Sequence, residues 1–140
     1  NHSVNELLPL LIMVDSSKVA TSYMVYQIIE GEILTVDMDS RIFSETEMAQ
    51  PSITRESLGI AYCLRKNEVF IRVHPRKTIL FTDCSSLIFL SRASSHNMKY
   101  YEMSLFLSSF ARLDIVSFPA KNMFLCDLGS RLFFDYTFKR

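Results

Sequence analysis

Residues 10–43, LLIMVDSSKVATSYMVYQIIEGEILTVDMDSRIF, decide the fold of this chain. They contain three apolar segments: Leu10–Val14, then Thr21–Ile29, which is rich in β-branched and aromatic residues, and then Ile33–Phe43. Residues of these types favour strands, and the tripeptide EGE at 30–32 predicts a hairpin turn between the second and third segments. The stretch therefore predicts three successive strands that pair antiparallel.

Helices and strands alternate in the rest of the chain. The elements expected there are a polar loop at Ser44–Gln50, a buried helix at Ser52–Lys66 with Ser52 as its N-cap, a loop at Arg72–Lys77, a strand at Thr78–Thr82, a helix at Asn97–Phe110, a strand at Leu113–Phe118 and a closing helix at Phe124–Phe134. We therefore expect one α/β domain over residues 1–140, in which a five-stranded mixed sheet has helices packed on it.

Composition narrows the classes of function. Hydrophobic residues make up 49% of the 140 residues, but no apolar run approaches the ~20 residues of a membrane span, so we expect no membrane partner. The formal net charge is zero, whereas a domain that binds nucleic acid alone is usually basic. A nucleic-acid substrate would therefore need a covalent neighbour to supply affinity.

The cysteines and the N-terminus bear on the setting of the protein. Cys63, Cys84 and Cys126 show neither CxxC pairing nor zinc-ligand spacing, which favours reduced, buried thiols and an intracellular location. The chain opens with Asn1–His2–Ser3, without an initiator Met or a signal peptide. We therefore expect a piece of a longer protein.

Four acids lie at the ends or within the first turns of the expected elements. Asp15 and Asp83 each follow an apolar strand, Glu56 lies in the helix at 52–66, and Asp127 lies near the start of the closing helix. Strand-end acids face the crevice where open α/β sheets bind ligands, and carboxylates held together repel one another unless a cation joins them. The pattern predicts a carboxylate cage for a divalent metal. Taken singly, each acid could instead be a turn residue or could complement a helix dipole.

Six blocks of the chain follow the order of one family's motifs. The blocks are VDSS at 14–17 (T-D-A-S in the family), DSR at 39–41 with Glu45–Glu47 (SR-x-L-x-x-x-E), RESLGI at 55–60 (x-E-L-L-A-I), FTD at 81–83 with Ser86–Leu90 (T-D-H-x-x-L-x-x-L), SLFLSSF at 104–110 (ALFLSRF), and PAK at 119–121 with DLGSR at 127–131 (PGK…ADALSR). Through them, residues 10–131 resemble the ribonuclease H domain of LTR-retrotransposon and retrovirus-like Pol polyproteins, particularly of the gypsy (metavirus) type.

The resemblance implies a ribonuclease H-like fold and hydrolysis of the RNA strand of RNA–DNA hybrids by two Mg²⁺ ions roughly 4 Å apart, for which Mn²⁺ could substitute. It implies that Asp15 bridges both ions, that Glu56 and Asp83 complete one side, and that Asp127 holds the other ion. The polar side chains expected to read the 2′-hydroxyls of the hybrid are Ser16, Ser17 and Ser86. The implied partners are a covalently linked reverse transcriptase polymerase and an integrase, in the cytoplasm or in virus-like particles.

The chain departs from the family pattern at several points. Glycines usually follow the first Asp, but Val19–Ser22 contain none. Cys84 stands where the family has His, Ala120 replaces the Gly of PGK, and no His lies just before Asp127. Because Gly permits close backbone approach, we expect the second strand to lie differently beside the site.

Two other interpretations remain open. A degenerate or domesticated copy could keep the fold as an interaction module, which the missing glycines favour and the four retained acids oppose. Another nuclease or an integrase could share the fold, but that class usually carries a Glu as its last acid, whereas this chain has the order D-E-D-D. The remaining strand acids, Asp37 and Asp39, are expected on the solvent face of the third strand, and Asp114 at the surface.

Overall fold

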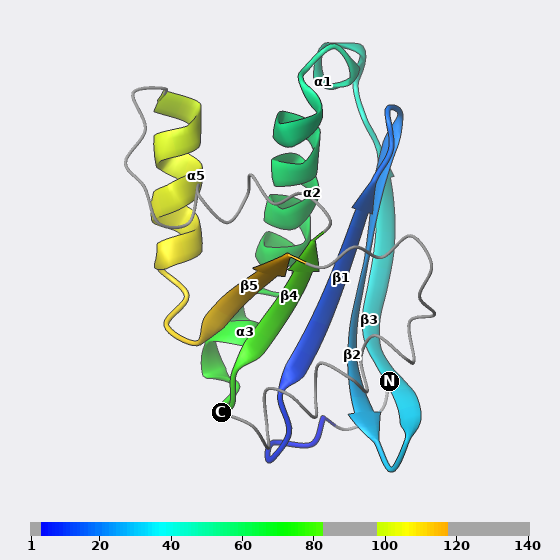
Figure 1. The fold of residues 1–140 in the computed structure, drawn as a ribbon, viewed down its shortest axis with the longest axis vertical. Coiled ribbons are helices and arrows are strands. Elements are labelled where there is room, and N and C mark those ends of the chain that lie inside the picture. The colour runs from blue at the N-terminus through cyan, green and yellow to red at the C-terminus, as the bar shows by residue number, and fades with distance from the viewer. Residues whose placement is uncertain (1–3, 83–97, 118–140) are drawn as a thin grey trace.

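The structure is a computed structural model that describes residues 4–82 and 98–117. Its centre is a five-stranded sheet in the order β3-β2-β1-β4-β5, with β1 at Leu10–Ser16, β2 at Ala20–Ile29, β3 at Glu32–Ile42, β4 at Thr78–Thr82 and β5 at Leu113–Ser117 (Figure 1). The strands β1, β2 and β3 pair antiparallel, while β4 pairs parallel with β1 and with β5. The predicted mixed α/β sheet is therefore confirmed.

The helices of the described residues are α1 at Glu45–Met48, α2 at Ser52–Lys66, α3 at Glu68–Val73 and α5 at Met98–Ser108. Helix α2 packs on β1 and β2, and α5 stands beside α2 in the helical layer (Figure 1). None of these helices has the length and apolar character needed to cross a membrane.

Two short helices correct the sequence interpretation, which assigned no helix to either segment. Helix α1 lies in the expected loop at 44–50 and begins with a capping box, in which the Ser44 hydroxyl accepts from the Glu47 amide and the Glu47 carboxylate accepts from the Ser44 amide. Helix α3 follows α2 directly after Asn67. Its sequence, EVFIRV, is rich in β-branched residues that favour strands, but burial of Ile71 in the core stabilises the helix.

The other expected boundaries agree closely with the structure. The helix at Ser52–Lys66 and the strand at Thr78–Thr82 are confirmed as predicted. The N-cap of α2 is Pro51 and not Ser52, and no side chain caps this helix. Asn97, Phe118 and the predicted closing helix at Phe124–Phe134 lie outside the described residues.

The side chains of β1 alternate between two hydrophobic clusters, one on each face of the sheet. Leu10, Ile12 and Val14 belong to the cluster that also contains Ile60, Cys63 and Leu64 of α2 and Leu107 of α5. Leu11 belongs to the second cluster, and Met13 packs against it. Continued along the strand, this alternation places Asp15 on the second face and Ser16 on the face that α2 covers.

The segment before β1 is fastened by two buried polar residues. The side chain of Gln27 is fully buried and donates to the carbonyl of Asn5 (2.8 Å), while its oxygen accepts from the Asn5 amide (2.9 Å). His74, in the expected loop at 72–77, is also buried and bonds the Leu8 carbonyl through Nε2 at 2.7 Å.

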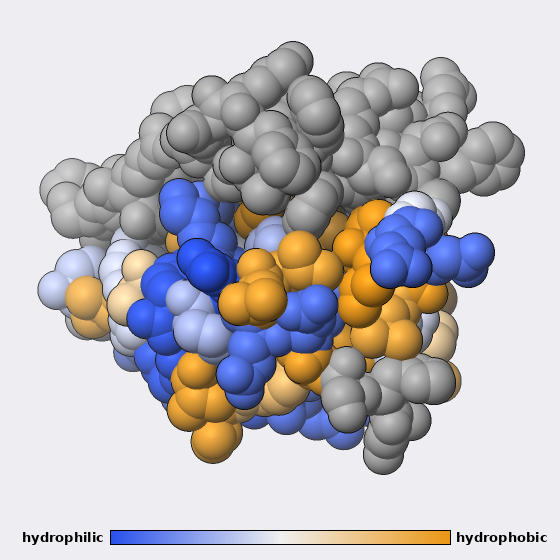
Figure 2. All heavy atoms as spheres, turned by 90° about the horizontal axis from the view of Figure 1, so that it is seen from below, coloured by the Kyte–Doolittle hydropathy of each residue, from blue (hydrophilic) through white to orange (hydrophobic). Residues whose placement is uncertain are grey.

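Hydrophobic side chains reach the surface, alongside hydrophilic ones, at the end of the molecule that carries the β2–β3 turn (Figure 2).

The β2–β3 turn contains a backbone strain that a substitution should relieve. Ile29 pairs with Glu32, so Glu30 and Gly31 form the loop, with φ of 53° and 79°. Two-residue turns of this kind prefer Asn-Gly, because Asn tolerates positive φ better than Glu does. We expect Glu30→Asn to raise the free energy of unfolding by about 1 kcal/mol in urea denaturation. The same change at Glu32, which has strand conformation, should bring no gain, and a destabilised Glu30→Asn would contradict this account of the turn.

Candidate active site

Asp15 lies in the part of β1 that extends beyond its described pairing with β4. The described ladder between β1 and β4 ends at the pair Met13–Phe81, whereas the ladder with β2 continues to Ser16, so that Asp15 pairs with Ser22. The Asp15 residue is exposed. It lines a shallow groove of about 490 Å³ that runs over β1, β2 and β3, and the other lining residues are Met13, Ser22, Tyr23, Met24, Met38, Asp39 and Ser40. Asp15 is therefore accessible from the groove.

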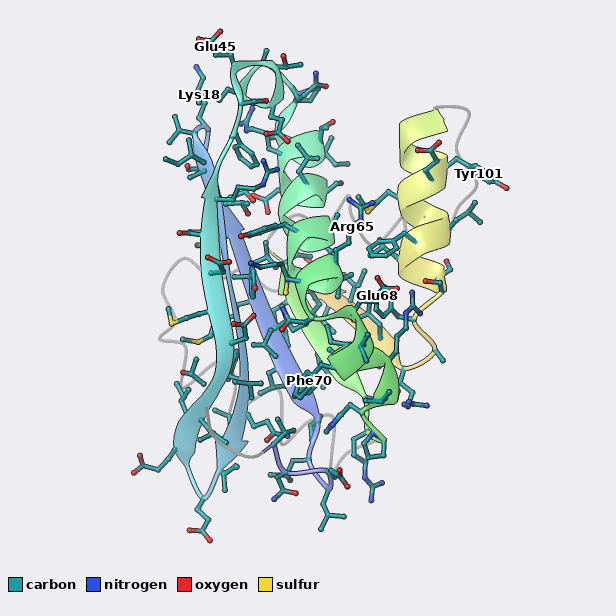
Figure 3. All side chains as sticks on the ribbon, turned by 180° about the vertical axis from the view of Figure 1, so that it is seen from behind. Lys18, Glu45, Arg65, Glu68, Phe70 and Tyr101 are labelled. Carbon is teal, nitrogen blue, oxygen red and sulfur yellow. The ribbon has the colours of Figure 1, made fainter. Side chains whose placement is uncertain are left out.

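Glu56 lies on the side of α2 that faces the sheet. It is half-buried and stands four and seven residues before Ile60 and Cys63, which are core residues, so the three side chains share one stripe of the helix. The opposite side of α2, with Leu58, Ala61 and Arg65, lines a cavity of about 280 Å³ next to α5. Arg65 points from α2 toward α5, where its guanidinium lies 5.0 Å from the centre of the Phe106 ring (Figure 3).

Helix α2, which carries Glu56, approaches the side chains next to Asp15 at Gly59, one turn after Glu56. A Cβ atom built on Gly59 would lie 2.7 Å from Ser16 Oγ and 3.0 Å from Val14 Cγ1, and closer still to Thr21 Oγ1. Since Val14 and Ser16 flank Asp15 in β1, α2 crosses the sheet at the strand end that carries Asp15. The structure thus places the strand end that carries Asp15 next to the helix turn before Gly59, which carries Glu56, and the roles of both acids remain predictions.

Asp83, Asp127 and Ser86 lie outside the described residues, so their predicted roles remain predictions. Within residues 4–82 and 98–117, no three His, Cys, Asp or Glu side chains form a group that could hold a metal ion. The remaining predicted site residues have structural bonds. Ser16 Oγ bonds Thr21 Oγ1 at 2.7 Å, and Ser17 Oγ accepts from the Ala20 amide at 3.1 Å within the β1–β2 turn.

Asp37 and Asp39 point toward α2, which corrects the expectation that they face solvent. A β-bulge between Val25 and Tyr26 shifts the β2–β3 register. Asp37 accepts from the Tyr23 hydroxyl at 2.7 Å, and Asp39 accepts from the Tyr62 hydroxyl at 2.8 Å. The hydrogen bond from Lys66, which is 2.9 Å away, and the bond from Tyr62 lower the pKa of Asp39 to about 2. Asp39 therefore joins β3 to α2, whereas Asp37 joins β3 to Tyr23 of β2 on the face that α2 covers.

The block around Arg41 also has a structural role that the sequence did not show. The Arg41 guanidinium donates to both carboxylate oxygens of Glu47 at 2.9 Å, and this contact is the main reason why the pKa of Glu47 falls to about 2. Because Glu47 also completes the capping box of α1, the ion pair fixes how the chain turns from β3 toward α2.

The sheet order, the strand directions and the helix that carries an acid across β1 together define a ribonuclease H-like fold. The family model described as "RNase H-like domain found in reverse transcriptase" matches residues 7–110, and the chain belongs to that family. No curated protein sequence matches the chain.

Solved structures agree with this assignment of the fold. The foamy viral protease-reverse transcriptase in complex with dsDNA superposes with a TM-score of 0.67 at 12% identity, over 86% of this chain and 25% of that chain. The same viral protein in complex with an RNA/DNA hybrid gives 0.65 at 12% identity, over 86% and 16%. LC11-RNase H1 in complex with an RNA/DNA hybrid gives 0.60 at 10% identity, over 79% and 85%. The chain thus spans a quarter or less of these viral proteins and most of LC11-RNase H1.

Proposed function

We propose that this domain hydrolyses the RNA strand of RNA–DNA hybrids as the ribonuclease H domain of a gypsy-type retroelement Pol polyprotein. The observation that carries the proposal is the meeting of β1 and α2 at Gly59, which brings the Asp15 strand end beside the Glu56 helix turn in a member of this family. A structural module would need neither acid at this crossing.

The donor chemistry of the site fits Mg²⁺. Carboxylate oxygens are the ligands that this hard cation prefers, and Mn²⁺ accepts the same ones. Asp15 and Glu56 would hold the metal together with Asp83, which directly follows Thr82, the last residue of β4, and with Asp127, whose assignment rests on the family motif. Bound ions of this kind polarise a phosphodiester and lower the pKa of the attacking water.

The hybrid would be held mainly through its shape and its phosphates. Asp15 is exposed in the groove, where the backbone of a hybrid would meet it, and Lys18 extends from the β1–β2 turn at the same end of the molecule, near Glu45 (Figure 3). The net charge of zero gives little electrostatic affinity. We therefore propose that a covalently linked polymerase supplies most of the binding, in a polyprotein that also contains an integrase and acts in the cytoplasm or in virus-like particles.

The proposal is tested by cleavage of a labelled RNA strand, presented as an RNA–DNA hybrid and as an RNA duplex, with Mg²⁺ or Mn²⁺. We expect the wild type to cut only the hybrid and only with metal, and Asp83→Asn to abolish cutting. Cutting of both duplexes, or an active Asp83→Asn, would contradict the assignment. An intact hybrid, even with the flanking polymerase attached, would instead favour a descendant that keeps the fold as an interaction module.

A further inference from the structure

Gly59 of α2 packs against two residues of the sheet, Ser16 and Thr21. Gly59 and Thr21 are buried, and the Ser16 and Thr21 hydroxyls bond each other at 2.7 Å directly opposite the glycine. Thr21 Oγ1 also lies 3.5 Å from the carbonyl oxygen of Asp15. The hydroxyl pair therefore touches the backbone of the predicted metal ligand on one side and α2 on the other.

Position 59 is occupied by glycine because there is no space for a side chain, and not because the backbone conformation requires it. Gly59 lies in the interior of α2 with an ordinary helical backbone, where Gly costs roughly 1 kcal/mol relative to Ala. Gly31, by contrast, has a positive φ that requires glycine. At position 59 any Cβ would meet Thr21 Oγ1, Ser16 Oγ and Val14 Cγ1 at once. Glycine at this position therefore lowers the intrinsic stability of α2 but lets the helix pack closely against β1.

We propose that Gly59 and the Ser16–Thr21 hydroxyl pair are positioning residues that set the separation of Asp15 and Glu56, and thereby the affinity of the site for divalent metal. This inference rests on the proposed function. Metal ligands must be held within about 0.5 Å of their productive geometry. A methyl group at position 59 moves α2 away from β1, and Glu56 moves with the helix, one turn from the point of contact.

The test is the binding of Mn²⁺ to the full protein, followed by electron paramagnetic resonance, for the wild type, Gly59→Ala and Ile71→Val. Residues that orient ligands without touching the metal typically change affinity by about 10- to 100-fold, so we expect Gly59→Ala to weaken Mn²⁺ binding at least about tenfold. Ile71→Val removes one buried methyl from α3 and should lower stability while leaving the dissociation constant unchanged.

Wild-type affinity in Gly59→Ala would overturn the inference. If that variant does not fold, Thr21→Val decides, because it keeps the branched shape but removes the hydroxyl bond to Ser16: weaker Mn²⁺ binding supports the inference and unchanged binding overturns it. Asp15→Asn distinguishes a failure of the proposed function from a failure of this inference alone. If Mn²⁺ binding does not depend on Asp15, both the proposed function and this inference fail. If it depends on Asp15 but not on Gly59, only this inference fails.

Discussion

Asp15→Asn should lower the rate of hybrid cleavage by about 10³-fold or more, the scale of loss when one member of a set of groups that act as a unit is removed. The amide keeps the size of the side chain but loses the negative charge that a divalent cation requires. Because Asp15 is exposed and follows the core residues of β1, the fold should tolerate the change, with a stability within about 0.5 kcal/mol of the wild type. Single-turnover cleavage of a labelled RNA strand measures the rate, and urea denaturation measures the stability.

Asp114→Asn is the matched control. Asp114 is also a strand carboxylate, but it lies in β5, where its oxygen is 3.0 Å from Lys77 Nζ. An exposed ion pair of this kind contributes little to stability. We expect Asp114→Asn to cleave the hybrid at the wild-type rate. If Asp15→Asn cleaved as fast as this control, Asp15 would not be a metal ligand.

Leu80→Ala should cause the largest loss of stability, about 3 kcal/mol. Leu80 is fully buried in β4, where it pairs with Ile12 of β1 and Ile115 of β5 and joins the cluster beneath α2. Truncation leaves a cavity in β4, which is hydrogen-bonded to β1 on one side and to β5 on the other. The neighbouring side chains therefore cannot easily move in to fill it. Domains of this size have only about 5–15 kcal/mol of net stability, so the urea midpoint should fall markedly.

Leu105→Ala provides the comparison for this loss. Leu105 is 54% exposed on α5. Its truncation should change the free energy of unfolding by no more than about 0.5 kcal/mol. A Leu80→Ala variant as stable as Leu105→Ala would contradict the central position of β4 in the sheet.

Apolar runs and β-branched segments in the sequence predicted most of the sheet, because strands that are buried on both faces need apolar residues at successive positions. The run of apolar residues before Asp15 fits a strand with a cluster on each side, and the β-branched segment at 21–29 fits its antiparallel neighbour. Helix α3 was not predicted, because its residues favour strands locally. The burial of Ile71 in the core stabilises the helix instead. The burial of His74 likewise depends on the carbonyl of Leu8, sixty-six residues earlier.

For the candidate site, the roles of the predicted acids remain predictions. Motif order indicated Asp15 and Glu56, and the structure brings their elements together. The solvent-face interpretation of Asp37 and Asp39 was wrong, because a β-bulge that no local pattern indicates turns both toward α2. The role of Gly59 could have been suspected from a glycine inside a long helix, but the opposing hydroxyls become visible only in three dimensions.

The chemistry of the ends left on the RNA tests the central claim most directly. We would incubate the wild-type protein, in excess over a labelled RNA–DNA hybrid, with Mg²⁺ and analyse the RNA fragments by mass spectrometry. The account predicts fragments with 5′-phosphate and 3′-hydroxyl ends, as expected when water attacks a phosphodiester in a metal site. Fragments with 2′,3′-cyclic phosphate ends, which arise when the RNA's own 2′-hydroxyl attacks, would contradict it, and so would RNA that stays intact even with the flanking polymerase attached.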